Sequence, residues 1–97
     1  MKTDSFHVFQ KLVEQLASLH QKAVTELTPQ VQEIIASKSQ DVTRIERTLD
    51  LLLDSACINE GLELLRDLCR YYWEIDAAST AIYINGYREM WDDDSLS

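Results

Sequence analysis

The chain has 97 residues and a mass of 11.2 kDa; 45% of the residues are hydrophobic and 27% are charged, with two Gly and one Pro. These values predict one small domain and argue against an all-β fold, which needs a turn about every 8–12 residues. A net charge of −8 without a basic stripe argues against binding to nucleic acid or to an anionic membrane surface. The sequence shows no membrane-spanning run and no signal peptide, so we expect a cytoplasmic protein.

The first forty residues predict two helices. The first is expected to begin at Asp4 or Ser5 and to end at about Leu27, with an amphipathic pattern typical of a surface helix. Thr28 and Pro29 are expected to start a second, short helix, because Pro is favoured in the first turn after a capping Thr. The apolar face of the first helix consists of Val8, Phe9, Leu12, Val13, Leu16, Leu19, Ala23 and Leu27, and that of the second consists of Val31, Ile34 and Ile35.

A third helix is predicted to begin at Ser39 or Asp41, and its apolar residues follow a bundle-like spacing. We expect the chain to stop and restart near Asn59 and Gly61, through a residue in the left-handed conformation, rather than to continue as one helix. The fourth helix, about residues 60–75, has two apolar seams and should lie in the middle of a bundle or at a subunit contact. The seams are Leu62, Leu65, Cys69 and Tyr72, and Leu64, Leu68, Tyr71 and Ile75.

Asp76 is expected to cap a fifth helix from Ala77 to about Trp91. Residues 92–97 read as an acidic C-terminal tail, which we expect to be disordered. The sequence therefore predicts an all-α fold: residues 1–91 form a single domain, a small bundle of four or five helices joined by short loops.

Motifs for catalysis, cofactors and metals are not found in the sequence. Two Gly cannot build the usual phosphate-binding loops. His7 and His20 project about 140° apart on one helix and cannot share an ion, while His20 is expected to be a half-buried packing residue. Cys57 and Cys69 are expected to be reduced thiols, with a disulfide across a helical hairpin as the alternative. We assign no catalytic, cofactor-binding or metal-binding residues and expect a non-enzymatic protein.

The acidic residues are unevenly distributed along the chain. Residues 1–40 have no net charge, whereas residues 41–97 hold thirteen acidic residues and five Arg. The acids recur at helical spacing beside Arg, which is typical of a solvated helix face with intrahelical pairs. The alternative is an acidic docking patch, for which we expect a partner protein with a basic surface.

Six of the eight aromatic residues lie between positions 71 and 91. Tyr83, Tyr87 and Trp91 share one arc of the last predicted helix, which either closes the core or forms an exposed anchor surface. Trp73 falls beside Arg66 and Arg70 on an otherwise polar strip, where it either stacks on Arg or anchors a partner. These six residues, Arg66, Arg70, Trp73, Tyr83, Tyr87 and Trp91, are the candidate partner-binding residues.

The leading hypothesis is a small acidic protein–protein interaction protein, such as an adaptor, inhibitor or regulator. A structural homo-oligomer is a second hypothesis, in which the third and fourth predicted helices associate into a homodimer or larger assembly. A third is an acidic nucleic-acid mimic that occupies a basic cleft of its partner.

Overall fold

The computed structural model describes residues 2–91, with side chains from Ser5 onward, and contains four helices. These are α1 (Lys2–Ala36), α2 (Val42–Ser55), α3 (Asn59–Trp73) and α4 (Ala77–Trp91). No strand occurs between residues 2 and 91, so the predicted small all-α bundle is confirmed, with four helices. The acidic tail predicted at residues 92–97 lies outside the described residues.

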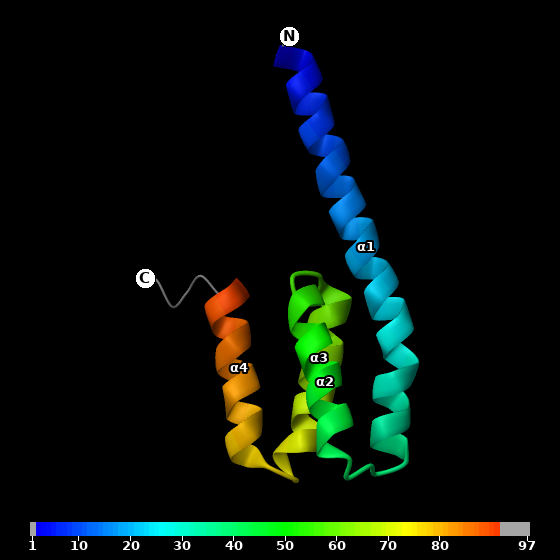
Figure 1. Cartoon of the computed structure of the whole chain (residues 1–97), viewed down its shortest axis with the longest axis vertical. Coiled ribbons are helices and arrows are strands. Elements are labelled where there is room, and N and C mark those ends of the chain that lie inside the picture. The colour runs from blue at the N-terminus through cyan, green and yellow to red at the C-terminus, as the bar shows by residue number, and fades with distance from the viewer. Residues whose placement is uncertain (1, 92–97) are drawn as a thin grey trace.

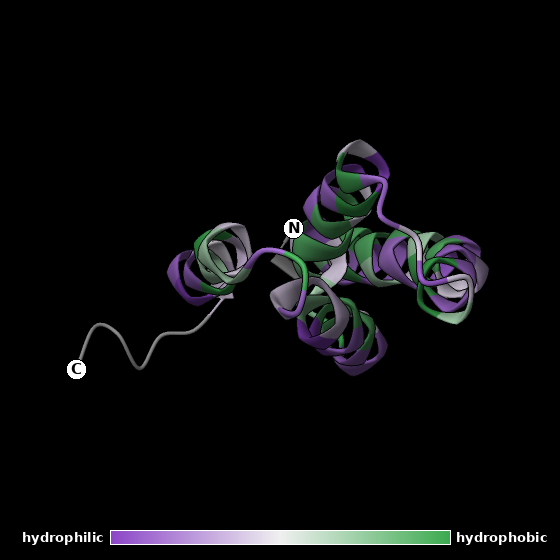
Figure 2. Cartoon of the chain, turned by 90° about the horizontal axis from the view of Figure 1, so that it is seen from below, coloured by the Kyte–Doolittle hydropathy of each residue, from purple (hydrophilic) through white to green (hydrophobic). Residues whose placement is uncertain are grey.

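The helices α2 and α3 occupy the centre of the bundle, with α1 on one side and α4 on the other (Figure 1). Within the described part of the chain, α4 contacts α2 and α3 but not α1. Seen from below, hydrophobic positions gather on the sides of the helices that are turned toward one another (Figure 2). The short connections force neighbouring helices to run in opposite directions, as expected for a bundle.

The core lies between the second half of α1 and the hairpin formed by α2 and α3. Its members are apolar side chains at helical spacing, so each helix buries one stripe. On α3 the buried residues come from both predicted seams: Leu65 and Tyr72 from the first, and Leu68 from the second. Both seams therefore pack mainly into the chain's own core. The core cluster consists of Leu27, Val31, Ile34, Ile45, Leu49, Leu52, Ala56, Leu65, Leu68, Cys69 and Tyr72.

The helix α1 runs through Pro29 without interruption, so the predicted helix end near Leu27 is wrong. An internal Pro removes a backbone hydrogen bond and costs about 3 kcal/mol. Here Val24, Leu27, Val31 and Ile34, on both sides of the proline, are at most 4% exposed. Their burial against the α2–α3 hairpin offsets the cost, and α1 changes direction along its length (Figure 1), as helices do at an internal proline.

The first half of α1 projects beyond the other three helices (Figure 1). We call residues 5–19 of this projecting half the arm. All seven of its large apolar side chains are between 48% and 68% exposed. The apolar face predicted for the first helix is therefore present. Among the described side chains up to Leu27, however, only Val24 and Leu27 are buried in the bundle. The exposed residues are Phe6, Val8, Phe9, Leu12, Val13, Leu16 and Leu19.

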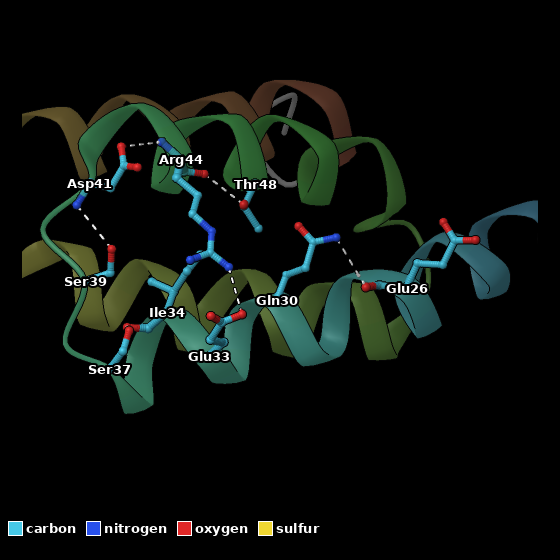
Figure 3. Close-up of polar contacts among 9 residues, drawn as sticks. All are labelled: Glu26, Gln30, Glu33, Ile34, Ser37, Ser39, Asp41, Arg44 and Thr48. Carbon is cyan, nitrogen blue, oxygen red and sulfur yellow. Dashed lines mark hydrogen bonds and ion pairs between the residues drawn. The ribbon is translucent and has the colours of Figure 1, made fainter.

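The turn between α1 and α2 is held by local polar contacts (Figure 3). Lys38 adopts the left-handed conformation, with φ of 54°, just after α1 ends. Asp41 caps α2 as predicted, because its Oδ1 accepts a hydrogen bond from the N–H of Arg44 at 3.1 Å. The Arg44 guanidinium also pairs with Glu33 on α1 at 3.1 Å, an exposed contact that contributes at most about 1 kcal/mol.

The chain leaves α2 at Ser55 and begins α3 at Asn59, so the predicted helix break is confirmed. The role expected for Gly61 is wrong, because no glycine here has a positive φ. Gly61 instead lies in the first turn of α3 against α2, where an added Cβ would stand 2.0 Å from the carbonyl oxygen of Ser55. Glycine is therefore required for the close approach of the two helices.

Two further side-chain hydrogen bonds stabilise the bundle, one at the start of α4 and one between α3 and α2. Asp76 caps α4 as predicted, since its Oδ1 accepts a hydrogen bond from the N–H of Ser79 at 3.0 Å. The buried Tyr72 on α3 donates its hydroxyl proton to Oε2 of Glu46 on α2 at 2.6 Å. Burial, reinforced by the hydrogen bond to the Glu46 carboxylate and by its charge, raises the pKa of Tyr72 to about 12.

Gly61→Ala should lower the free energy of unfolding by about 2–4 kcal/mol, because the methyl group must push the α3 backbone away from Ser55. The matched control is Gly86→Ala on α4, where an added Cβ would lie 3.6 Å from Leu53 Cδ1 in ordinary contact. That substitution should stabilise the protein by about 0.5–1 kcal/mol through helix propensity. Urea unfolding followed by circular dichroism measures both values; equal effects would contradict the close approach at Gly61.

Alkaline pH should destabilise the bundle through Tyr72. The pKa of Tyr72 is about 12 in the folded chain, against the ordinary value of 10.0 that we take for the unfolded chain. The contribution of the neutral hydroxyl to the free energy of unfolding is therefore complete below pH 10 and is lost as the pH rises to 12. Tyr72→Phe should lower the free energy of unfolding by about 1 kcal/mol at neutral pH, because the hydrogen bond to Glu46 is lost. Between pH 10 and 12, however, the free energy of unfolding of the variant should fall less steeply than that of wild type. Parallel urea titrations across this range test the prediction, and identical slopes for the two proteins would refute it.

Candidate functional site

A groove with a volume of about 390 Å³ lies between α3 and α4. Its floor is apolar: Leu65 and Cys69 of α3 are buried and Leu62 is half-buried beside them. The α4 side of the groove is formed by Ile84 and Tyr87. Its rim consists of three exposed α3 residues, Arg66, Arg70 and Trp73.

Helical spacing explains how α3 builds both the floor and the rim. Residues three or four positions apart are neighbours on a helix surface, so Leu62, Arg66, Arg70 and Trp73 follow one line along α3. The other two floor residues, Leu65 and Cys69, lie beside this line on the core side. The predicted apolar seam and the predicted polar strip thus meet at the edge of the groove.

The groove stays open because α4 contributes little to the core. Along α4 only Thr80 is buried, whereas Ile82, Ile84 and Met90 are all more than 40% exposed. A helix without a continuous apolar stripe cannot pack closely along its full length. The wall that α4 provides therefore stands away from α3 over the floor residues.

The rim is locally basic although the chain is acidic. Within the side chains described, the ion pair formed is Arg44–Glu33, so neither Arg66 nor Arg70 has a carboxylate partner there. Trp73, which is 50% exposed, lies at the same rim. Two guanidinium groups and an indole around an apolar floor can bind a segment that combines apolar side chains with carboxylates.

Four of the six candidate partner-binding residues line the groove: Arg66, Arg70, Trp73 and Tyr87. The other two contact α2. Trp91 donates its Nε1 proton to the carbonyl oxygen of Leu53 at 2.7 Å.

Tyr83 is half-buried against the core. Burial, with the nearby carboxylates of Asp50 and Glu46, raises its pKa to about 12. The aromatic arc predicted for α4 is therefore divided between the groove, where Tyr87 lies, and the α2 side, where Tyr83 and Trp91 lie.

Sequence reasoning missed the floor of the groove. Leu62, Leu65 and Cys69 were assigned to a seam expected in the middle of a bundle or at a subunit contact, and Ile84 was not among the six candidate partner-binding residues. The signal that could have found them is the weak apolar pattern of residues 77–91, which leaves part of the α3 seam without a close neighbour.

The remaining candidates for chemistry are isolated from one another. His20 is half-buried as predicted, with its Nδ1 3.4 Å from the hydroxyl oxygen of Ser55. Among the described residues, no group of three or more His, Cys, Asp or Glu is arranged to hold a metal ion. Cys57 is exposed and Cys69 buried, and both are free thiols. No helix within residues 2–91 has the length and apolarity needed to cross a bilayer.

Together, these features describe a small four-helix protein with an apolar interhelical groove under a basic rim. Comparisons with protein-family models, with curated proteins and with solved structures give no match to this chain. What the groove binds is therefore inferred from its own shape and charge.

Cys69 should react far more slowly with thiol reagents than Cys57 does. Burial raises the pKa of the Cys69 thiol to about 11, so about 0.1% of it is thiolate at pH 8, and the side chain is only 8% exposed. Iodoacetamide labelling at pH 8, followed by peptide mass spectrometry, should modify Cys57 first. In Cys57→Ser only the slow reaction should remain; rapid labelling of Cys69 would show that the floor is open to the reagent.

Proposed function

We propose that this chain is a non-catalytic protein-binding protein that holds a segment of its partner in the α3–α4 groove. The observation that carries the proposal is an apolar floor bordered by Trp73 and by two guanidinium groups that lack carboxylate partners among the described residues. Trp and Arg around a desolvated apolar centre are the residue types that contribute most to binding at protein interfaces.

The groove fits an amphipathic helix that is apolar on one side and acidic along its edge. Arg66 and Arg70 are one helical turn apart, about 6 Å along α3, so two carboxylates with the same spacing can pair with them. A volume of about 390 Å³ accommodates a few side chains of such a segment, at the lower end of the range for ligand sites.

This partner differs from the basic one that the net charge of the chain suggested. The residues that line the groove include two guanidinium groups and no carboxylate, so a bound segment contacts Arg66 and Arg70 directly, whereas Glu63, Asp67 and Glu74 of α3 lie outside the lining. The net charge of −8 instead disfavours partners that are acidic over their whole surface. We therefore expect an acidic motif within a partner that is otherwise neutral or basic.

Capture from a cell lysate, identification by mass spectrometry and calorimetry with the purified partner test this proposal. Trp73→Ala should weaken binding by at least about 30-fold, and Arg66→Glu with Arg70→Glu should weaken it by a similar amount, as expected for hot-spot residues. The matched control is Ile82→Ala, which removes a side chain of α4 that is 69% exposed and does not line the groove.

Ile82→Ala should bind within about twofold of wild type, because exposed side chains outside an interface contribute little to affinity. A partner that binds both groove variants as tightly as wild type would exclude the groove as its site.

A further inference from the structure

The arm is an apolar helix face that nothing in this chain covers. Its seven large apolar side chains, each about half to two-thirds exposed, present on the order of 700 Å² of apolar surface. The largest apolar patch on a typical monomer is about 300–600 Å². Each partner in a standard specific interface buries about 800 Å², so the arm has the area of one half of such an interface.

The spacing of these residues is that of a coiled-coil seam. Phe9, Leu12, Leu16 and Leu19 are separated by three, four and three residues, the alternation of heptad positions a and d. Phe6 and Val13 widen the seam on one side. An isolated helix of this length is marginal in water, so a partner for this face would also stabilise the arm itself.

Electrostatics favour a second copy of the chain as that partner. The arm contains one Lys and one Glu, Lys11 and Glu14, and has no net charge, whereas residues 20–97 carry the whole net charge of −8. Two copies can therefore meet through their arms without repulsion. An antiparallel arrangement also places the two acidic bundles at opposite ends of the paired arms, whereas a parallel one would place them side by side.

We propose that two copies of this chain form a dimer by pairing their arms as an antiparallel coiled coil. The pairing is confined to the arms, because from His20 onward α1 is already covered by α2, where His20 Nδ1 lies 3.4 Å from the Ser55 hydroxyl. This dimer is independent of the groove, because it uses residues of α1 alone.

Sedimentation equilibrium tests the dimer with two double variants that each add two carboxylates three residues apart. Val13→Glu with Leu16→Glu places them on the apolar face of the arm, where both side chains are about half exposed. The control, Ser18→Glu with Gln21→Glu, places them at exposed positions on the opposite face. Both variants should remain folded by circular dichroism, because none of the four side chains is in the core.

Wild type and the control should sediment at twice 11.2 kDa at tens of micromolar. The apolar-face variant should sediment at 11.2 kDa, with a dissociation constant at least about 100-fold higher, because pairing the arms would bury its added carboxylates in an apolar interface. A wild-type monomer at millimolar concentration, or an apolar-face variant as dimeric as wild type, would overturn the proposal. A wild-type monomer that binds phosphatidylserine vesicles through the arm would likewise overturn it and would identify a membrane-surface helix instead.

A spin label at Gln21→Cys, in a Cys57→Ser background, tests the orientation. Antiparallel pairing of residues 5–19 places residue 21 of each copy beyond opposite ends of the paired arms, so the two labelled positions are separated by more than about 20 Å along the axis. Parallel pairing would hold them at the same height, with no axial separation, and they would be separated only across the pair by more than the roughly 10 Å between the helix axes, because residue 21 faces away from the seam. A distance distribution centred near the shorter value would overturn the antiparallel arrangement.

Discussion

The close approach of α2 and α3 at Gly61 is the constraint on which the rest of the bundle depends. With no side chain at this position, the first turn of α3 rests on the backbone of Ser55, and the hairpin closes tightly at one end. Tyr72 joins the same two helices further along through Glu46. The second half of α1 then packs on a surface that is already defined, and its burial keeps α1 helical through Pro29.

The groove is a consequence of unequal packing on the two sides of this hairpin. The α1 side is filled by large aliphatic side chains such as Val31 and Ile34, which are almost completely buried. The α4 side is joined through the buried Thr80, through the half-buried rings of Tyr83 and Tyr87, and through the hydrogen bond of Trp91 to Leu53 at the far end of α4. Between these attachments α3 keeps an apolar surface that α4 does not cover, and this is the floor of the groove.

Much of the fold could be predicted from sequence because its signals are local. Asp41 and Asp76 cap helices through contacts with residues three positions away, which the sequence alone specifies. Pro29 was misinterpreted because its effect depends on how much apolar surface α1 buries on both sides of it. Gly61 was correctly placed at a helix boundary, but its packing role depends on a neighbouring helix and has no local signal.

The candidate site was predictable only in part, for the same reason. A helical wheel groups Trp73 with Arg66 and Arg70, since all three belong to one helix. It cannot show that Trp91 faces α2 while Tyr87 faces the groove, because that division depends on where α4 sits. Periodicity likewise identified the apolar face of the arm but not that the other helices end before reaching it.

The light attachment of α4 gives the groove an adjustable wall. Segments with few buried apolar contacts have the lowest free energies of local opening in a folded protein. On α4 only Thr80 is fully buried and Tyr83 and Tyr87 are half-buried, so we expect this helix to open at a lower free energy than the α1–α3 core does. If the groove binds a partner segment as proposed, its width would adapt to side chains of different sizes, and one small scaffold would tolerate several related binding sequences.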